Sequence, residues 1–170
     1  MILRLTQKLA TKVHAGRLCE RSLDENKFAD WTCNLFVADR MQYIIMSNTA
    51  SLYSCVMYAR GVTDDSRLIG RVLDTIRDFT EHDGHASVYQ RYIAPASELV
   101  TFAKSLNRSV TGSMNDLIKF AQHHLTEDDM SPFDVGLKLN GILLSALAAP
   151  TRPSYGKPSD AFKMQLESQQ

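Results

Sequence analysis

Three strand-like segments follow one another closely between residues 31 and 59. The first, WTCNLFVAD, places Trp31, Cys33 and Leu35 on one face, and the residues between them are also largely apolar, as in a strand covered on both sides. The turns DRMQ and SNTA separate it from the segments YIIMS and SLYSCVMYA. Connections this short join antiparallel neighbours, because parallel strands need a long crossover. The sequence therefore predicts an antiparallel meander and not a doubly wound sheet.

Three amphipathic helices are predicted on the C-terminal side of the meander. Apolar residues recur there with the spacing of a helical turn. Thr63 is the predicted N-cap of the first helix. Ser131, followed by Pro132, predicts the start of the third helix, since proline suits the first helical position. The predicted ranges are 64–81, 110–125 and 132–148.

The fold predicted from these segments is α+β, an antiparallel sheet of four to five strands with the three helices packed on one face. Residues 2–5 predict a further short strand. Residues 97–105 fit a strand or a helix, and their β-branched and aromatic residues favour the strand. A chain of 170 residues suits one domain. We expect it to span residues 1–150, with a proline-containing tail over residues 151–170 that packs on it, extends from it or forms a last short helix after Ser159.

The charge balance limits the classes of partner. Lys and Arg total 19, as do Asp and Glu, so the net charge is zero, whereas a non-specific nucleic-acid binder carries a basic excess that neutralises phosphates. Nucleic acid is therefore not indicated as a partner, while a protein partner or a second copy of the chain fits the composition. Arg4, Lys8 and Lys12 form a modest basic stripe that is typical of a solvated face.

The cysteines and the hydropathy indicate a protein of a reducing compartment. Cys19, Cys33 and Cys55 are odd in number and lack the close spacing of a disulfide framework or a zinc site. The N-terminal segment lacks the continuous apolar core of a signal peptide. The longest apolar run, at residues 141–150, is too short to cross a membrane. We therefore expect a cytoplasmic location and no membrane association.

The segment SLNRSVTGSMNDL, residues 105–117, gathers polar functional groups at a predicted strand–helix junction. One interpretation is structural. In it, Ser109 or Ser113 caps the helix, and Arg108 pairs with Asp116. The spacing of the segment matches neither of the standard glycine-rich phosphate loops.

Two functional interpretations of the same segment are also open. In the first, backbone N–H groups at the helix start bind an anion such as phosphate or a carboxylate, together with Arg108 and the hydroxyls of Ser109, Thr111 and Ser113. In the second, Ser109 or Ser113 is a nucleophile. A nucleophilic serine needs a base nearby, and none is adjacent in the sequence.

The histidines do not predict a metal site. His82 and His85 flank the turn HDGH, and His123 and His124 are adjacent in a predicted helix, where neighbouring side chains point to different sides. A metal ion needs several ligands that converge from separate elements. The acidic run at residues 127–129 lies at a predicted helix boundary, where solvated charge is expected. We therefore predict no metal site and no cofactor.

Three motifs occur in order along the chain: MILRLTQKLA at its start, DWTCNLFVADRMQYIIMSNTASLYS in the meander and SLNRSVTGSMNDL at the junction. Together they resemble a family of small prokaryotic proteins, a domain of unknown function, with a signature close to NRSVxGSMND. The resemblance runs from Met1 to about residue 150, and the long N-terminal loop and the tail depart from it. It implies a shared fold and no activity. It also implies that the residues of the signature act as one unit, in folding or in binding: Asn107, Arg108, Ser109, Gly112, Ser113, Asn115 and Asp116.

Two function classes follow. The favoured class is a non-enzymatic binding module that recognises a polar or anionic ligand, or a macromolecular partner, at the junction 105–116. The alternative is a small hydrolase or nuclease-like enzyme that uses Arg108, Ser113 and Asp116. Zero net charge, the lack of metal-ligand spacing and the lack of a nucleophile–base pair favour the binding module. Its candidate ligand-binding residues are Asn107, Arg108, Ser109, Ser113, Asn115 and Asp116.

Overall fold

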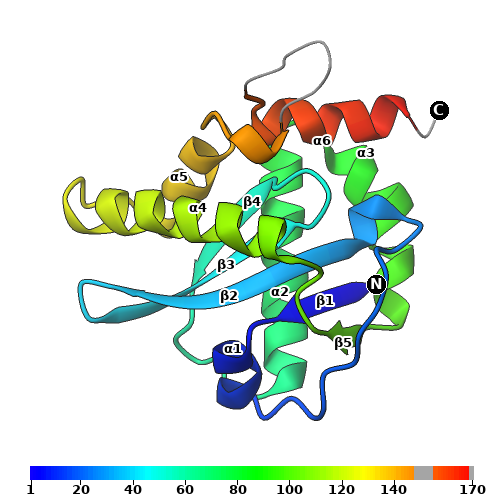
Figure 1. Ribbon diagram of the computed structural model, residues 1–170, viewed down its shortest axis with the longest axis horizontal. Coiled ribbons are helices and arrows are strands. Elements are labelled where there is room, and N and C mark those ends of the chain that lie inside the picture. The colour runs from blue at the N-terminus through cyan, green and yellow to red at the C-terminus, as the bar shows by residue number, and fades with distance from the viewer. Residues whose placement is uncertain (148–154, 169–170) are drawn as a thin grey trace.

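A five-stranded sheet forms the centre of the computed structural model, which describes residues 1–147 and 155–168. Its strands are β1 (Ile2–Leu5), β2 (Asp30–Ala38), β3 (Met41–Asn48), β4 (Ser54–Tyr58) and β5 (Thr101–Ala103). They lie in the order β4–β3–β2–β1–β5 across the sheet (Figure 1). β2, β3 and β4 pair as consecutive antiparallel neighbours. The meander predicted from the short turns is therefore confirmed.

The sheet is mixed, so the prediction of a purely antiparallel sheet is wrong. β1 runs parallel to both of its neighbours, β2 and β5. Residues 6–29 connect β1 to β2, which is long enough for the crossover that a parallel pair needs. The antiparallel prediction rested on the short turns of the meander, and these say nothing about strands that are joined by long connections.

Helices cover both faces of the sheet, which corrects the expectation that they pack on one face. α4 passes in front of the sheet in Figure 1, and α2 passes behind it. None of the helices in the described part of the chain has both the length and the apolar character needed to cross a bilayer. The helices are α1 (Gln7–Lys12), α2 (Asp65–His82), α3 (Ala86–Val88), α4 (Arg108–Thr126), α5 (Pro132–Leu139) and α6 (Pro158–Glu167). Single 3₁₀ or π-helical turns are Lys27–Ala29, Tyr89–Ile93, Pro95–Glu98 and Ser145–Leu147.

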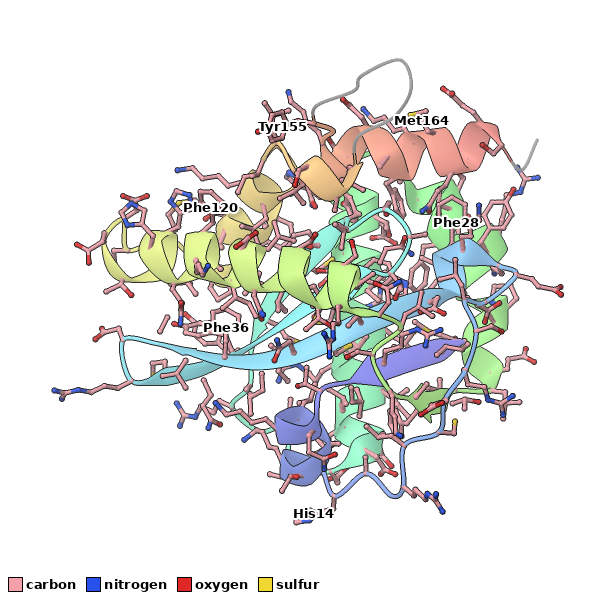
Figure 2. The ribbon with its side chains drawn as sticks, in the orientation of Figure 1. His14, Phe28, Phe36, Phe120, Tyr155 and Met164 are labelled. Carbon is pink, nitrogen blue, oxygen red and sulfur yellow. The ribbon has the colours of Figure 1, made fainter. Side chains whose placement is uncertain are left out.

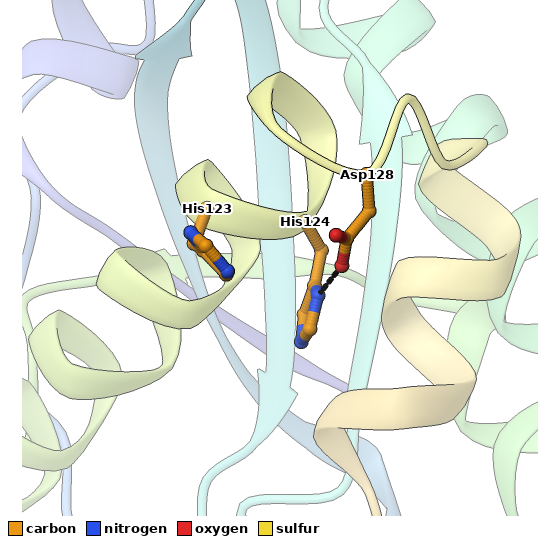
Figure 3. Close-up of side chains that lie close together, drawn as sticks. All are labelled: His123, His124 and Asp128. Carbon is orange, nitrogen blue, oxygen red and sulfur yellow. Dashed lines mark hydrogen bonds and ion pairs between the residues drawn. The ribbon is translucent and has the colours of Figure 1, made fainter.

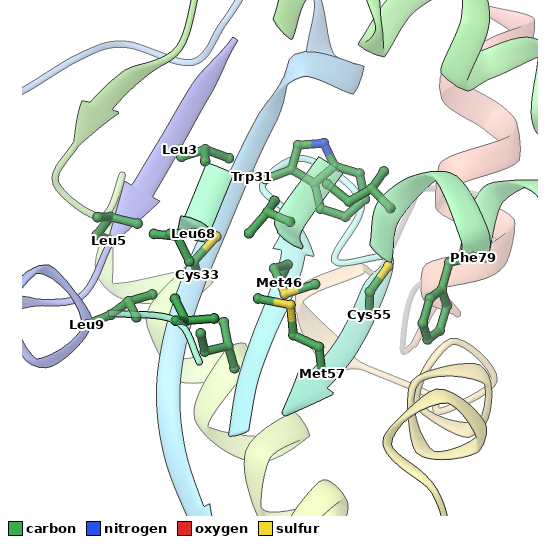
Figure 4. Packing of buried hydrophobic residues seen from close by; sticks show 14 of the residues in the cluster. Leu3, Leu5, Leu9, Trp31, Cys33, Met46, Cys55, Met57, Leu68 and Phe79 are labelled. Carbon is green, nitrogen blue, oxygen red and sulfur yellow. The ribbon is translucent and has the colours of Figure 1, made fainter. Parts of the chain in front are cut away.

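The alternation along β2 explains why both faces are covered. Trp31, Cys33 and Leu35 belong to the core beneath α2, part of which is shown in Figure 4. Phe36 and Ala38 belong to a second core beneath α4 and α5. All five side chains are buried, as expected for a strand between two helical layers. The apolar character of both faces of β2 is therefore the feature of the sequence that indicates three layers.

The starts of two helices test the predicted N-caps. Asp64, and not Thr63, caps α2, because its Oδ1 accepts a hydrogen bond from the backbone N–H of Arg67 at 2.9 Å. Ser131 caps α5 as predicted, and its Oγ accepts a hydrogen bond from the backbone N–H of Asp134 at 3.1 Å. Aspartate and threonine both suit an N-cap, so the choice between adjacent candidates depended on where the helix begins.

α5 ends at Leu139, earlier than the predicted end at residue 148, which itself lies outside the described residues. The side chain of Asn140 explains the early end. Its Oδ1 accepts a hydrogen bond from the backbone N–H of Ser54 at 2.7 Å, and its Nδ2 donates to the carbonyl oxygen of Ser54 at 3.0 Å. β4 is an edge strand, so the Asn140 amide pairs backbone groups that a neighbouring strand would otherwise pair.

A buried ion pair lies on the same side of the sheet as α4. Nε of Arg4 is 2.7 Å from Oδ1 of Asp30, and both side chains are fully buried. The guanidinium also donates to the carbonyl oxygens of Arg21, Ser22 and Lys104. Arg4 therefore ties β1, β2, the long N-terminal loop and the end of β5 together. The expectation that Arg4 lies on a solvated face is wrong, because its alternation in β1 turns it inward.

The final helix, α6, packs on the core beneath α2. Phe162 is buried in that core, with its ring centroid 4.4 Å from that of Tyr53 and 5.1 Å from that of Phe28. A last short helix after Ser159 was one of the three expectations for the tail, and α6 is such a helix, although it already begins at Pro158. The predicted domain boundary at residue 150 lies outside the described residues.

The three cysteines differ in their access to solvent. Burial raises the pKa of the Cys33 thiol to about 12, and it raises the pKa of the Cys55 thiol well above its usual value. Cys19 is only partly buried. Because the thiolate is the reactive form, we expect Ellman's reagent to label at most Cys19 in the folded protein and all three thiols in denaturant. Labelling of all three at equal rates without denaturant would contradict this expectation.

Candidate functional site

α4 begins at the predicted junction, and Asn107 is its N-cap. Oδ1 of Asn107 accepts a hydrogen bond from the backbone N–H of Val110 at 3.0 Å. The expectation that Ser109 or Ser113 caps this helix is therefore wrong. Asparagine is as good an N-cap as serine, and the helix already begins at the residue after Asn107.

Arg108 and Asp116 do not pair, contrary to the structural interpretation of the junction. Oδ1 of Asp116 lies 3.2 Å from Nζ of Lys119, one turn further along α4. Eight residues of helix separate Arg108 from Asp116, which is about 12 Å along the axis. Within the described part of the chain, the exposed guanidinium of Arg108 has no hydrogen-bond or ion-pair partner. The side chains of Ser109 and Asn115 are exposed as well.

Ser113 and Asp116 line a groove of about 680 Å³ that runs beside α4. Lys119, Phe120 and His123 continue the same wall, because residues three, four and seven positions apart fall on one face of a helix. Phe120 and Tyr155 lie on the same side of the molecule in Figure 2. We call this feature the α4 groove. Its opposite wall consists of Leu143, Leu144, Ser145 and Tyr155.

A single β-bridge holds the opposite wall of the α4 groove. The backbone N–H of Leu144 donates to the carbonyl oxygen of Gly156 at 2.8 Å, and the N–H of Gly156 donates to the carbonyl oxygen of Leu144 at 3.0 Å. A Cβ atom on Gly156 would collide with the carbonyl oxygen of Leu147. Glycine at this position therefore allows the bridge, which carries Leu143 and Tyr155 to the groove.

The α4 groove gathers large apolar side chains that the described residues leave partly exposed. Phe120, Leu143 and Tyr155 are 45%, 58% and 54% exposed, respectively. Single exposed apolar residues are normal on a protein surface, but a group of them around one concavity is typical of an interaction site. The polar groups of Ser113 and Lys119 lie in the same groove. The lining therefore suits a ligand that has an apolar body and a polar group.

A second cluster lies at the C-terminal end of α4, where the side chains of His123, His124 and Asp128 come together (Figure 3). Nδ1 of His124 is 2.6 Å from Oδ2 of Asp128. This hydrogen bond lowers the pKa of the Asp128 carboxyl below its usual value. The ring centroids of His123 and His124 are 5.5 Å apart. The two rings therefore lie close together, although we expected the side chains of these neighbouring residues to point to different sides of the helix.

The described residues do not place a base beside Ser113. His123 lines the same groove, but ten residues of helix separate the two, about 15 Å along the axis. A nucleophile and its base must lie within hydrogen-bonding distance, or within reach through one water molecule. Asp116 is one turn from Ser113, and its carboxylate is bound to Lys119.

The sequence pointed to part of this site and missed the rest. Ser113 and Asp116 were candidates, and the helical stripe that contains them also passes through Phe120 and His123, so that wall could have been found from spacing alone. The spacing of His124 and Asp128, four residues apart, was a signal for their contact. The opposite wall had no signal, because it depends on the early end of α5 and on the bridge at Gly156.

Comparison with known proteins gives a family and no activity. A family model described as Domain of unknown function (DUF6933) matches residues 2–161 of the chain. No curated protein and no solved structure matches the chain significantly. A function must therefore be argued from the geometry of this chain.

Proposed function

We propose that this chain, which belongs to the family described as Domain of unknown function (DUF6933), is a non-enzymatic binding protein that holds a small amphipathic ligand in the α4 groove. The observation that carries the proposal is the size of the groove together with its lining. A volume of about 680 Å³ is within the range of small-molecule sites, whose walls are mostly apolar with a few polar groups. A macromolecular partner, the other occupant that the sequence allows, needs a larger contact surface.

The apolar part of the ligand would lie between Phe120 on α4 and Leu143 and Tyr155 on the opposite wall. These side chains are partly exposed, so a ligand that covers them removes apolar surface from water. Aromatic side chains on both walls favour a flat or aromatic ligand body, since rings contribute beyond their buried area when they stack.

The polar part of the ligand would lie toward the start of α4, near Ser113 and Lys119. Oγ of Ser113 has no hydrogen-bond partner among the described residues, so it is available to a ligand as a donor or an acceptor. Lys119 is the cation of the groove lining, and its ammonium is 3.2 Å from the carboxylate of Asp116 in the same wall. An anionic head group would bind Lys119 in competition with Asp116. Of the other candidate residues at the junction, Asp116 lines the groove, with its carboxylate 3.2 Å from Nζ of Lys119. Asn107, Ser109 and Asn115 are not among the residues that line it, so we propose polar contacts from them only for a ligand that extends beyond the groove toward the start of α4.

A hydrolase or nuclease-like enzyme that uses Arg108, Ser113 and Asp116 is the less favoured alternative. It would require a general base for Ser113, and the roughly 15 Å of helix between Ser113 and His123 argues against His123 in that role. Asp116 engages Lys119 at 3.2 Å. These distances support binding without chemistry at the groove.

Binding of the dye 1-anilinonaphthalene-8-sulfonate, an aromatic anion, tests the proposal. We expect one molecule to bind per chain with increased fluorescence. Phe120→Ser and Leu143→Ser should each weaken binding about tenfold, because each removes about 1–2 kcal/mol of apolar contact. Lys119→Met should weaken it as well. Binding is measured by fluorescence titration, and circular dichroism checks that each variant is folded.

Leu99→Ser is the matched control for these variants. Leu99 is 77% exposed and lies outside the groove, so this variant should bind the dye like the original chain. Equal dye binding by the Phe120→Ser, Leu143→Ser and Leu99→Ser variants would reject the α4 groove as the binding site.

We also propose a cytoplasmic location and a prokaryotic source for the protein. All three cysteines are free, and unpaired buried thiols are typical of reducing compartments. The prokaryotic source rests on the sequence resemblance alone. Detection of the protein in the soluble cytoplasmic fraction of its cells tests the location.

A further inference from the structure

The end of α4 holds two imidazoles and a carboxylate in a fixed arrangement. One ligand atom from each of His123, His124 and Asp128 lies within 4.8 Å of the other two. Around a tetrahedral ion with bonds of about 2.0–2.2 Å, ligand atoms lie about 3.4 Å apart. The longest separation, which is at most 4.8 Å, must therefore shorten by at most about 1.4 Å, and the side chain of His123, which would move, is exposed.

The backbone at this helix end keeps Asp128 next to His124. The backbone N–H of Met130 donates to the carbonyl oxygen of His124 at 3.2 Å, and Asp129 adopts a left-handed conformation with φ of 48°. This turn closes the helix and directs the chain back toward α5. The side chain of His124 is 19% exposed and that of Asp128 is 41% exposed, and a 2.6 Å hydrogen bond holds the two side chains next to each other. Nδ1 and Oδ2 are too close together for both to bind one ion, so a metal ion that uses this pair of atoms would replace the hydrogen bond.

We propose that His123, His124 and Asp128 bind a divalent transition-metal ion of the zinc type. Two imidazole nitrogens and one carboxylate oxygen form a donor set that Zn²⁺ uses, with water in the fourth position. The negative end of the helix dipole also favours a cation here. Because nitrogen ligands suit transition metals better than they suit Mg²⁺ or Ca²⁺, the hard cations should bind poorly.

Lys138 on α5 is the neighbour that opposes a metal ion. Its Nζ lies 3.9 Å from Oδ2 of Asp128, and its side chain is 52% exposed. The ammonium group repels a cation at the carboxylate through their like charge. Replacing Lys138 with methionine should therefore tighten metal binding without changing any ligand.

The proposed metal site shares His123 with the α4 groove, but its other two ligands, His124 and Asp128, do not line the groove. An ion bound there would lie at the end of the groove that is farthest from Asn107 and Arg108. The test below measures the metal alone, so its result does not depend on whether the groove binds an organic ligand.

Isothermal titration calorimetry of the full chain with Zn²⁺ alone tests the site. We expect one Zn²⁺ per chain and no comparable binding of Mg²⁺. His123→Ala, His124→Ala and Asp128→Asn should each weaken Zn²⁺ binding at least about tenfold, since even the outer partners of metal ligands contribute that much. Lys138→Met should strengthen it.

Two controls separate this site from other metal-binding groups. His14→Asn removes an exposed histidine elsewhere, and asparagine tolerates the φ of 54° found at that residue. Cys19→Ser removes the partly exposed thiol. Both variants should bind Zn²⁺ like the original chain. The proposal is overturned if the original chain binds no Zn²⁺, if the double variant His123→Ala/His124→Ala keeps full affinity, or if Cys19→Ser abolishes binding.

Discussion

Replacing Arg4 with methionine is expected to lower the free energy of unfolding by about 3–5 kcal/mol, because it leaves a buried carboxylate without its charged partner. Arg4 and Asp30 are both fully buried, and two of their nitrogen–oxygen contacts are 2.7 and 2.8 Å long. The same substitution also leaves the carbonyl oxygens of Arg21 and Ser22 without their donor. Urea denaturation followed by circular dichroism gives the change in unfolding free energy.

Two further variants show whether the loss comes from the buried charge. Arg77→Met removes an exposed arginine that pairs with Asp74 at 3.0 Å, and this should cost less than about 1 kcal/mol. The double variant Arg4→Met/Asp30→Leu removes both charges and should recover part of the loss. If Arg4→Met costs no more than Arg77→Met, the buried pair does not stabilise the fold as argued.

Replacing Asn140 with alanine is expected to cost about 2–4 kcal/mol, since it leaves two buried backbone groups unpaired at about 1–3 kcal/mol for each group. The groups are the N–H and the carbonyl of Ser54, which the Asn140 amide pairs at 2.7 and 3.0 Å. Asn140 is 3% exposed and Ser54 is fully buried. Thermal unfolding gives the change in stability.

Amide hydrogen exchange identifies the cause of that loss. The amide of Ser54 should be protected in the original chain and should exchange faster in Asn140→Ala, because its acceptor is gone. Asn115→Ala is the matched control, since Asn115 is exposed on α4 and surface substitutions change stability by about 0.5 kcal/mol or less. A Ser54 amide that stays equally protected in Asn140→Ala would argue that another group pairs it.

The parts of the fold that depend on segments close together in the sequence could be predicted. The connections at residues 39–40 and 49–53 are short, so the antiparallel pairing of β2, β3 and β4 followed from chain length alone. The stripes of apolar residues placed α2 and α4 within two residues of their observed ends. The sequence did not show the orientation of β1 or the face of the sheet that each helix covers. A long connection can return the chain in either direction and to either face.

The candidate site also contains residues that local signals in the sequence identified and residues that they did not. Ser113 and Asp116 were found because polar residues gather at a predicted strand–helix junction, which is a local signal. Arg4 was misplaced, because a basic residue in a short strand can face solvent or a buried partner, and Asp30, 26 residues away, decides between the two. The histidines at the end of α4 were judged separately from Asp128, which the helix brings beside His124.

By itself, the sequence determined the elements of this protein: a meander, amphipathic helices with polar starts, free thiols and a balanced charge. These depend on propensities and spacings within a few residues. The tertiary structure alone decided the mixed order of the sheet, the burial of Arg4, the end of α5 at Asn140 and the wall of the α4 groove at Leu144 and Gly156. Each of these joins residues that are distant in sequence, and such contacts form only when packing satisfies buried groups that local structure leaves unpaired.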